Sequence, residues 1–353
     1  MAVVVDGAQG SHIWAAGKAP RPVSRALDWD RRAECIHIAL VNNMPDLALD
    51  DTELQFLELL DAASDNLNVH LHLYALAGIP RNRRAQQHLD ELYFDTRDLG
   101  NRGFDAVIVT GTEPNQSDLR NEPYWAPLIN LMDWAEENTV STVLSCLAAH
   151  AGVLYSDGIA RQPLSNKRFG VFEFCTTRDH ALTGRSAALL QFPHSRWNDL
   201  AVDELKSGGY QVFTESPVDG VDLFVKKKRK SLFVHFQGHP EYSRLTLFKE
   251  YRRDVRRFLK RERDHYPGLP NGYFDPAAVE LLNDFREQAI ESPSEQLMAE
   301  FPEAPIAATL ENTWRASATC VYRRWLQYVM SRKTESLAFS ASSGIARARS
   351  AAG

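Results

Sequence analysis

The chain has 353 residues, of which 44% are hydrophobic and 24% are charged, and its formal net charge at pH 7 is −6. These values are ordinary for a globular protein with a sizeable core, and the negative net charge argues against a nucleic-acid partner. No stretch approaches the roughly 18 consecutive apolar residues that a membrane span needs, and no secretory signal is visible at the N-terminus. The sequence therefore predicts a cytoplasmic protein that binds neither nucleic acid nor a membrane.

Strand and helix patterns alternate through the first half of the chain. Apolar runs predict strands at residues 35–41, 69–76, 105–111 and 140–146, and apolar periodicity predicts helices at 50–63, 123–138 and 147–155. This alternation is typical of an α/β fold with a doubly wound, mostly parallel sheet flanked by helices. Ligands bind such sheets beyond the carboxyl ends of the strands, where Gly111, Cys146 and His239 are expected.

The second half of the chain is expected to extend this sheet with antiparallel strands. Residues 160–235 carry shorter β-like pieces, and 245–264 and 318–330 are expected to form C-terminal helices. The basic run "KKKRK" (226–230) lies between two strand-like stretches, so we interpret it as a solvated hairpin tip. A patch that contacts phosphate is the alternative.

Both ends of the chain lack periodicity. The N-terminal segment mixes Gly, Ala, Pro and Arg, and the last residues are rich in Ser, Ala and Arg. We therefore expect a poorly ordered extension over residues 1–30, one domain over 31–332 and a disordered tail over 333–353.

One cysteine lies at a position suited to catalysis. The four cysteines are scattered without the paired spacing of a zinc site, so neither a metal nor a disulfide is expected. Cys146, however, falls where the buried strand "VSTVLSC" ends and a helix of small residues begins. Such a turn exposes a nucleophile, and the free N–H groups of the helix favour an anion there. A buried, inert cysteine is the alternative.

A histidine and a glutamate follow another strand. In "FQGHPEY" (236–242), Gly238 and Pro240 predict a turn that holds His239 and Glu241 at the sheet edge. A thiolate nucleophile needs a base, and the base needs a carboxylate that orients it, so the three side chains would form a complete triad. His150 competes for the role of base. It lies four residues after Cys146 and would point along the helix, so we assign it to the core.

An ordered set of motifs resembles the homoserine O-succinyltransferase family, whose fold is similar to that of class I glutamine amidotransferases. The set covers about residues 35–330 and comprises "VNNMPDLALDDTELQFLELL", "FDAVIVTGTEPN", "EPYW", "SCLAAH", "NKRFGVFE", "PHSRW", "GHPEY" with "EYRRDV" after it, and "NTWRASATCVYRRWLQYV". The resemblance implies that Cys146 forms an acyl thioester, that His239 accepts a proton and that Glu241 orients His239. It also implies three substrate-binding residues: Lys167, Ser195 and Arg253.

Asn115 matches the position that the family ties to the choice of acyl donor. This position is glycine in succinyl-transferring members and glutamate in acetyl-transferring members. A neutral Asn115 does not repel a succinyl carboxylate and could donate a hydrogen bond to it, so succinyl-CoA is favoured. The length of the Asn115 side chain and the nearby Glu113 would instead favour acetyl-CoA, and this alternative stays open.

The resemblance implies a ping-pong acyltransferase with no bound cofactor. It would move the succinyl group of succinyl-CoA to the hydroxyl of L-homoserine on the route to methionine, and a homodimer is possible. The alternatives are a homoserine or serine O-acetyltransferase that uses acetyl-CoA, a glutaminase-type amidotransferase and a non-catalytic binding protein. Against the glutaminase, "LSCLA" has Leu144 and Ala148 where amidotransferases commonly have glycines.

Overall fold

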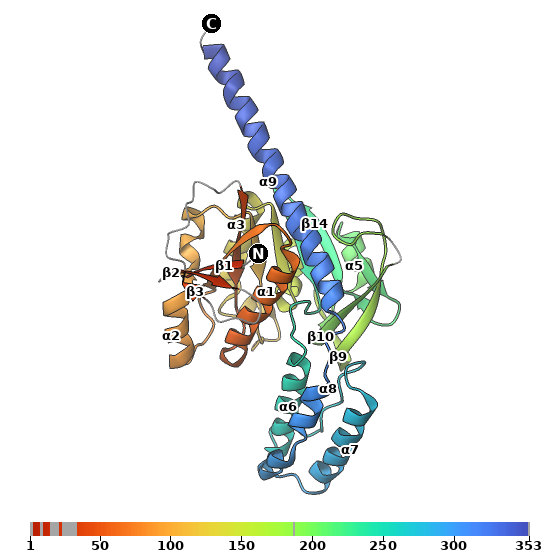
Figure 1. The fold of residues 1–353 in the computed structure, drawn as a ribbon. Helices are drawn as coiled ribbons and strands as arrows, with labels where there is room; N and C mark the ends of the chain where they lie inside the picture. Colours follow the sequence, from red (N-terminus) through yellow and green to blue (C-terminus); the bar gives the residue numbers. More distant parts are fainter. Residues whose placement is uncertain (1–2, 8–9, 15–20, 23–33, 186–187, 352–353) are drawn as a thin grey trace.

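The computed structural model describes residues 3–7, 10–14, 21–22, 34–185 and 188–351 and contains two sheets (Figure 1). The strands of the larger sheet are, in spatial order, β11 (Gln211–Val212), β14 (Leu223–Lys228), β15 (Ser231–Phe236), β8 (Ser141–Ser145), β7 (Ala106–Val109), β4 (Cys35–Val41), β5 (Asn68–Ala75), β1 (Val3–Gly7), β2 (Gly10–Trp14) and β3 (Arg21–Pro22), with β6 (Phe94–Asp95) also beside β5. The centre of this sheet, from β15 to β1, is parallel. Antiparallel strands flank it at both edges. The mostly parallel α/β fold is therefore confirmed.

The smaller sheet is antiparallel and separate from the first. Its order is β10 (Leu189–Asp199), β9 (Gln162–Thr176), β12 (Thr214–Ser216) and β13 (Gly220–Val221). The added antiparallel strands that we predicted are therefore present, but most of them build this second sheet and do not extend the first. The long β9–β10 ribbon carries Lys167 and Ser195.

The helices are α1 (Leu49–Ala63), α2 (Arg83–Leu92), α3 (Trp125–Asn138), α4 (Leu147–Asp157), α5 (Val202–Ser207), α6 (Thr246–Leu259), α7 (Pro276–Glu291), α8 (Glu303–Thr309) and α9 (Arg315–Ala351). Short 3-10 helices lie at η2 (Asp46–Ala48), η3 (Thr96–Asn101), η4 (Leu119–Asn121) and η5 (Glu295–Glu300). None of the helices in this described part of the chain combines the length and the apolar character that crossing a bilayer requires.

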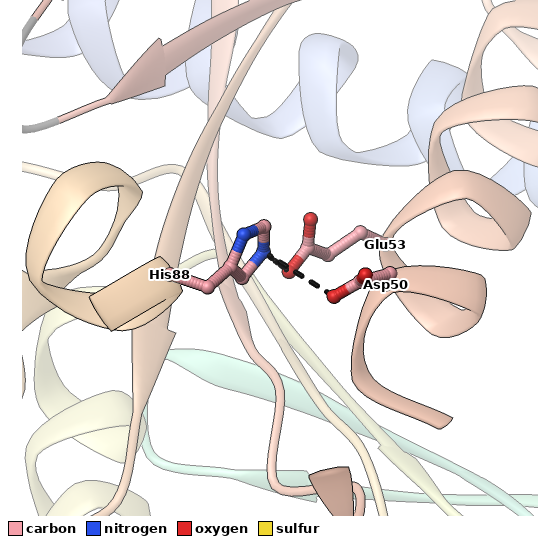
Figure 2. A group of neighbouring side chains, drawn as sticks. All are labelled: Asp50, Glu53 and His88. Carbon is pink, nitrogen blue, oxygen red and sulfur yellow. Dashed lines mark hydrogen bonds and ion pairs between the residues drawn. The ribbon is translucent and has the colours of Figure 1, made fainter. Parts of the chain in front are cut away.

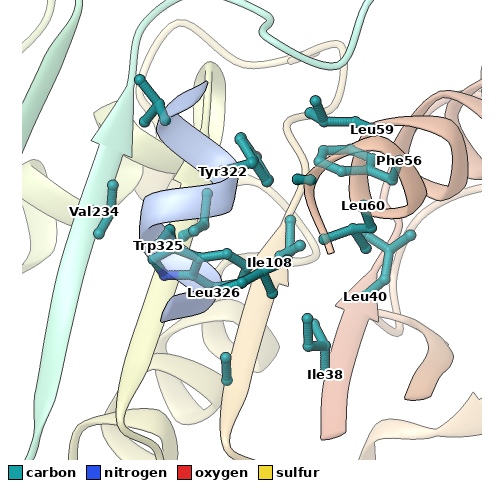
Figure 3. Close-up of a cluster of buried hydrophobic side chains, with 14 of the residues drawn as sticks. Ile38, Leu40, Phe56, Leu59, Leu60, Ile108, Val234, Tyr322, Trp325 and Leu326 are labelled. Carbon is teal, nitrogen blue, oxygen red and sulfur yellow. The ribbon is translucent and has the colours of Figure 1, made fainter. Parts of the chain in front are cut away.

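Different helices cover the two faces of the larger sheet. On one face, α1 and the first half of α9 pack against Ile38 and Leu40. Figure 3 shows Trp325 of α9 on the same face, between the strands that carry Val234 and Ile108. On the other face, α3 and α4 pack against Ala39 and Val41. Because side chains alternate along a strand, β4 is buried on both faces, as its uniformly apolar sequence predicts.

Helices α6, α7 and α8 form a lobe of their own. Figure 1 shows α6, α7 and α8 together at one end of the molecule, below the smaller sheet. Trp314, Phe285 and Leu282 are among the buried side chains that hold this lobe together. Phe169 and Val171 of β9 belong to the same apolar cluster and attach the lobe to the ribbon.

The basic run forms the tip of the β14–β15 hairpin, as we predicted. Its side chains bind carboxylates of α3 and α4: Lys228 Nζ lies 3.0 Å from Glu136 Oε1, and Lys226 Nζ lies 2.5 Å from Asp157 Oδ1. Arg229 pairs with Glu137. These ion pairs account for the run without a phosphate ligand.

The structure differs from the prediction at both ends of the chain. Residues 3–7, predicted to be poorly ordered, form β1, which pairs in parallel with β5 and buries Val3 completely. The β-branched run "VVV" favours a strand, and it covers an edge of β5 that would otherwise be open. Strands also form at residues 10–14 and 21–22, and the rest of the predicted extension lies outside the described residues.

The predicted tail is helical over residues 333–351, because α9 continues to Ala351 and projects from the body (Figure 1). The segment contains no proline, and its five alanines, which favour helix most, outweigh the weaker helix propensity of its five serines and of Gly344. Residues 352 and 353 lie outside the described residues.

Candidate active site

Three parallel strands end at one edge of the larger sheet. In their registers Val109 is beside Leu144, and Phe236 is beside Ser145. The residues that follow these strands therefore meet in space, as we predicted from their order in the sequence. A hydrogen bond of 2.8 Å from Cys146 N to Phe236 O joins the second strand end to the third.

Cys146 occupies a strained turn between β8 and α4. Its φ of 51° lies in the left-handed region, where residues other than glycine are uncommon. Helix α4 begins at the next residue, so the free N–H groups of its first turn lie beside the thiol. The structure thus places Cys146, which is partly buried, in the strand-to-helix turn that we predicted for a nucleophile.

The imidazole of His239 lies between a thiol and a carboxylate. His239 Nδ1 is 2.8 Å from Glu241 Oε1, and both side chains are buried. The ring also hydrogen-bonds with the Cys146 thiol. A hydrogen bond of 2.8 Å from His239 N to Pro193 O fixes the backbone of this turn. The structure therefore brings together the three residues predicted to form the triad.

Electrostatics favour a charged His239. Burial alone would lower its pKa, but the negative charges of Cys146 and Glu241 outweigh burial and hold the pKa of His239 well above its usual value. A histidine that favours its charged form therefore lies between the Cys146 thiol and an orienting carboxylate.

His150 has a different environment. It is buried, and its Nε2 lies 2.9 Å from Gln237 Oε1. Burial lowers the pKa of His150 to about 3, so the ring stays neutral. Our assignment of His150 to the core agrees with this position.

The three predicted substrate-binding residues gather around two carboxylates of α6. Lys167 Nζ lies 3.5 Å from Glu250 Oε2 and 3.5 Å from Asp254 Oδ2. Ser195 Oγ donates to Glu250 as well, and Arg253 Nε lies 3.3 Å from Asp254 Oδ1. This cluster of both signs, which we call the α6 cluster, could hold the ammonium and the carboxylate of an amino acid.

Tyr242 connects the α6 cluster to His239. Its ring stacks on that of His239, with centroids 4.2 Å apart and planes at 17°. Its hydroxyl donates to Glu250 Oε1 at 2.7 Å. The α6 cluster therefore lies close to the thiol and the imidazole.

Gly111 packs against the start of α4. A Cβ added to Gly111 would lie 3.0 Å from Leu147 N. The residue after the nucleophile commonly donates its N–H to an oxyanion in such turns, so a side chain at position 111 would crowd this donor. Gly111, Leu147 and Ala148 also line a small cavity beside the nucleophile.

Asn115 lies on the loop after β7, and its side chain is exposed. The buried Glu122 holds this loop, because its Oε1 accepts hydrogen bonds of 2.6 Å from the backbone N–H groups of Asn115 and Gln116. The charge of Glu113, on the same loop, acts on Arg253 of the α6 cluster.

A family model described as homoserine O-succinyltransferase matches residues 22–336. The chain belongs to the homoserine O-succinyltransferase family. Two members named homoserine O-succinyltransferase illustrate the similarity. The protein from Rhodopseudomonas palustris is 44% identical over 302 residues, which are 86% of this chain and 90% of that protein. The protein from Methylorubrum extorquens is 40% identical over 326 residues, which are 92% of each chain.

Among solved structures, a glutamine amidotransferase from Thermotoga maritima superposes with a TM-score of 0.39 and 11% sequence identity, covering 84% of this chain and 98% of that chain. A GMP synthase subunit protein from Thermoplasma acidophilum gives a TM-score of 0.41 and 15% identity, covering 59% and 86%.

The sequence did not reveal a buried polar network behind the triad of this family member. Asp222 Oδ1 accepts a hydrogen bond of 2.7 Å from the N–H of Gly238, the residue directly before His239. The same oxygen lies 3.5 Å from His194 Nε2, and all three residues are buried. Burial raises the pKa of Asp222 to about 7. A polar residue at the end of a β-like stretch was the only signal for Asp222.

The C-terminal helix region supports the catalytic turn from behind. Trp314 Nε1 donates to Tyr242 O at 3.0 Å, and Tyr322 of α9 stacks on Phe236 at 5.9 Å between ring centroids. The tryptophan-rich segment shared with the family therefore fixes the backbone next to His239 and Glu241.

A second cluster of ionisable residues lies between α1 and α2 (Figure 2). Asp50, Glu53 and His88 are close enough to share a metal ion. Their contacts are those of an ion pair: His88 Nε2 is 2.7 Å from Glu53 Oε1, and this hydrogen bond raises the pKa of His88. Tyr93 OH also donates to Glu53 Oε1 at 2.5 Å. The cluster is thus explained as a link between two helices, and the expectation of no bound metal stays a prediction.

Proposed function

We propose that the protein is a homoserine O-succinyltransferase that works through an acyl-cysteine. The observation that carries this proposal is the position of Cys146 between His239 and the start of α4, in a chain that belongs to the family. This arrangement supplies a nucleophile, a base and an oxyanion site, which acyl transfer requires.

The first half of the reaction acylates the enzyme. The Cys146 thiolate attacks the thioester carbonyl of succinyl-CoA, and the Leu147 N–H stabilises the oxyanion that forms. The C–S bond to CoA then breaks, and the departing thiolate takes the proton that His239 holds. The products are free CoA and a succinyl thioester on Cys146.

The second half transfers the acyl group. His239 is now neutral and removes the proton from the hydroxyl of L-homoserine, whose oxygen attacks the thioester carbonyl. Collapse of this second oxyanion breaks the bond to sulfur, which restores the thiolate and the imidazolium. Glu241 keeps the ring oriented throughout and stabilises its charge.

The α6 cluster suits the amino-acid acceptor. Lys167 and Arg253 would hold its carboxylate, and Glu250 and Asp254 would hold its ammonium group. Arg253→Lys keeps the charge but loses the fork geometry of the guanidinium, so the KM for the acceptor should rise. Equal kinetics for both side chains would place Arg253 outside the site.

A substrate panel tests the proposal. Purified protein is given succinyl-CoA or acetyl-CoA together with L-homoserine or L-serine, and the ester product is quantified. We expect the highest kcat/KM with succinyl-CoA and L-homoserine. A higher kcat/KM with acetyl-CoA would reject the proposed donor. No ester product from any pair, together with hydrolysis of L-glutamine in a separate assay, would reject acyl transfer.

A further inference from the structure

Arg161 is a cation beside the nucleophile that the family resemblance does not assign. It lies between the end of α4 and the start of β9, and it is half-buried. Its charge interacts with the Cys146 thiol and with Tyr124. Its guanidinium makes one weak hydrogen bond, from Nη2 to Ser117 O at 3.4 Å. Within the described part of the chain it forms no ion pair.

The carboxylates near Arg161 already bind other donors. Asp118 accepts hydrogen bonds from Arg120 Nε at 3.0 Å and from Arg120 Nη2 at 2.7 Å. Glu122 Oε1 accepts hydrogen bonds from two backbone N–H groups of the loop that carries Asn115, whereas Glu122 Oε2 is buried with no hydrogen-bond partner among the described residues. The guanidinium of Arg161 is therefore held near carboxylates without being paired to one, which leaves it available to an anionic ligand.

Tyr124 offers a second donor on the same side of the thiol. Its side chain is 5% exposed, and its hydroxyl is buried with no hydrogen-bond partner among the described residues. Tyr124 lines the small cavity that Gly111, Leu147 and Ala148 also line. Burial raises the pKa of Tyr124, so the hydroxyl remains protonated and can donate. A buried polar group without a partner is costly, so a ligand group that accepts this hydrogen bond would be stabilised.

The cations on the other side of the thiol are committed to the α6 cluster. Lys167 binds Glu250 and Asp254, and Arg253 binds Asp254. Among the described residues, neither Glu250 nor Asp254 forms an ion pair with Arg161. Arg161 is thus a cation near Cys146 that does not belong to the α6 cluster, and the proposed reaction has two substrates that each carry a free carboxylate.

We propose that Arg161, together with the Tyr124 hydroxyl, binds the distal carboxylate of the succinyl group while that group is attached to CoA and then to Cys146. This proposal rests on the proposed function, and in it Arg161 and Tyr124 would select an acyl donor that carries a second carboxylate. It also gives a reason why the loop that carries Asn115 affects donor choice, because Arg161 is hydrogen-bonded to Ser117 of that loop.

The test compares two acyl donors of equal chain length. Succinyl-CoA carries the distal carboxylate, and butyryl-CoA carries a methyl group in its place. The rate of CoA release in a single turnover, without acceptor, is measured for the unmodified protein and for Arg161→Ala. We expect the rate with succinyl-CoA to fall about 10- to 100-fold, as for the loss of a hydrogen bond to a charged group, and the rate with butyryl-CoA to change less than about threefold.

Three further variants separate this role from others. Arg161→Lys keeps the charge and should recover part of the preference for succinyl-CoA. Tyr124→Phe removes only a hydroxyl that has no partner, so it should fold normally and lower the succinyl rate selectively. Arg97→Ala removes an exposed arginine of η3, whose partner is Asp95, and should leave the ratio of the two donors unchanged.

Two outcomes would overturn the inference. If Arg161→Ala lowers the rate of CoA release equally with succinyl-CoA and butyryl-CoA, Arg161 acts on the thiol, on the CoA moiety or on the fold. An unchanged donor ratio in both Arg161→Ala and Tyr124→Phe would place the carboxylate elsewhere. Failure of the proposed function is distinguishable, because the unmodified protein would then release no CoA from succinyl-CoA in the first place.

Discussion

At the scale of single residues, two histidines near one thiol have opposite properties. His239 has a carboxylate on one ring nitrogen and hydrogen-bonds with the Cys146 thiol, and its pKa is raised. His150 has only the Gln237 amide as a partner, and burial lowers its pKa. The charge of its partners therefore decides which imidazole can carry a proton during the reaction.

This difference predicts unequal effects of removing each ring. His239→Ala should lower kcat by about 10²- to 10⁴-fold, the usual contribution of a positioned acid–base group. His150→Ala should retain activity within about tenfold and lower stability by about 1–3 kcal/mol, because it leaves a buried Gln237 without its partner. Steady-state kinetics and thermal unfolding of both variants check this prediction. The roles are reversed if His150→Ala is the inactive variant.

Asp222 gives a prediction for pH dependence. Burial raises its pKa from 3.8 to about 7 in the folded protein. Between these values the folded state holds a proton that the unfolded state has lost, so the stability contributed by Asp222 is present at low pH and is lost as the pH rises toward 7. Asp222→Asn keeps an acceptor for Gly238 N but does not titrate. Its Tm, relative to that of the unmodified protein, should therefore be higher at about pH 8 than at about pH 5. The same Tm difference at both pH values would show that Asp222 does not titrate in this window.

The sequence predicts the triad but not its surroundings. Cys146, His239 and Glu241 each follow an apolar strand, and strand ends in a parallel sheet meet at one edge. Asp222, Glu250 and Tyr124 carry no comparable signal in the local sequence. The contacts that define the site join residues separated along the chain, such as Ser195 with Glu250, 55 residues apart, and Asp222 with Gly238, 16 residues apart. Such contacts are set by tertiary packing.

At the scale of elements, the predicted bounds match the observed bounds best for strands that are buried on both faces. The strand predicted at 35–41 is β4 with the same bounds, because it is apolar throughout and buried on both faces. The strand predicted at 105–111 is shorter in the structure, where Thr110 and Gly111 belong to the catalytic edge. The second sheet was not predicted as a separate unit, since its partially exposed strands lack a uniform apolar pattern and their pairing is decided by long-range contacts.

The N-terminal strand provides a stability prediction at this scale. Val3 of β1 is completely buried against the core, whereas Val218 is 82% exposed. Val3→Asp places a carboxylate in an apolar site and should lower the free energy of unfolding by about 2 kcal/mol or more, while Val218→Asp serves as the matched control with little effect. Thermal or denaturant unfolding measures both. Equal stabilities would mean that β1 does not pack on β5 in solution.

At the scale of the whole molecule, segments distant in the sequence converge on one sheet edge. The strand ends supply Cys146 and His239, and the β9–β10 ribbon and α6 supply the α6 cluster. Trp314 and α9 pack behind the turn that carries His239 and Glu241. Family membership accounts for the order of these motifs along the chain. The sequence predicts which segments form the candidate active site, and the structure shows which charged side chains of these segments pair with one another.

The most direct test of this account is the mass of the intact protein after incubation with succinyl-CoA in the absence of an acceptor. We predict one added succinyl group, located on Cys146 by peptide mapping, that forms in the unmodified protein and not in Cys146→Ala. Addition of L-homoserine should remove the group and yield O-succinylhomoserine in equal amount. A protein that transfers succinyl to L-homoserine without ever carrying it on Cys146, or an adduct that L-homoserine does not discharge, would contradict the acyl-cysteine mechanism.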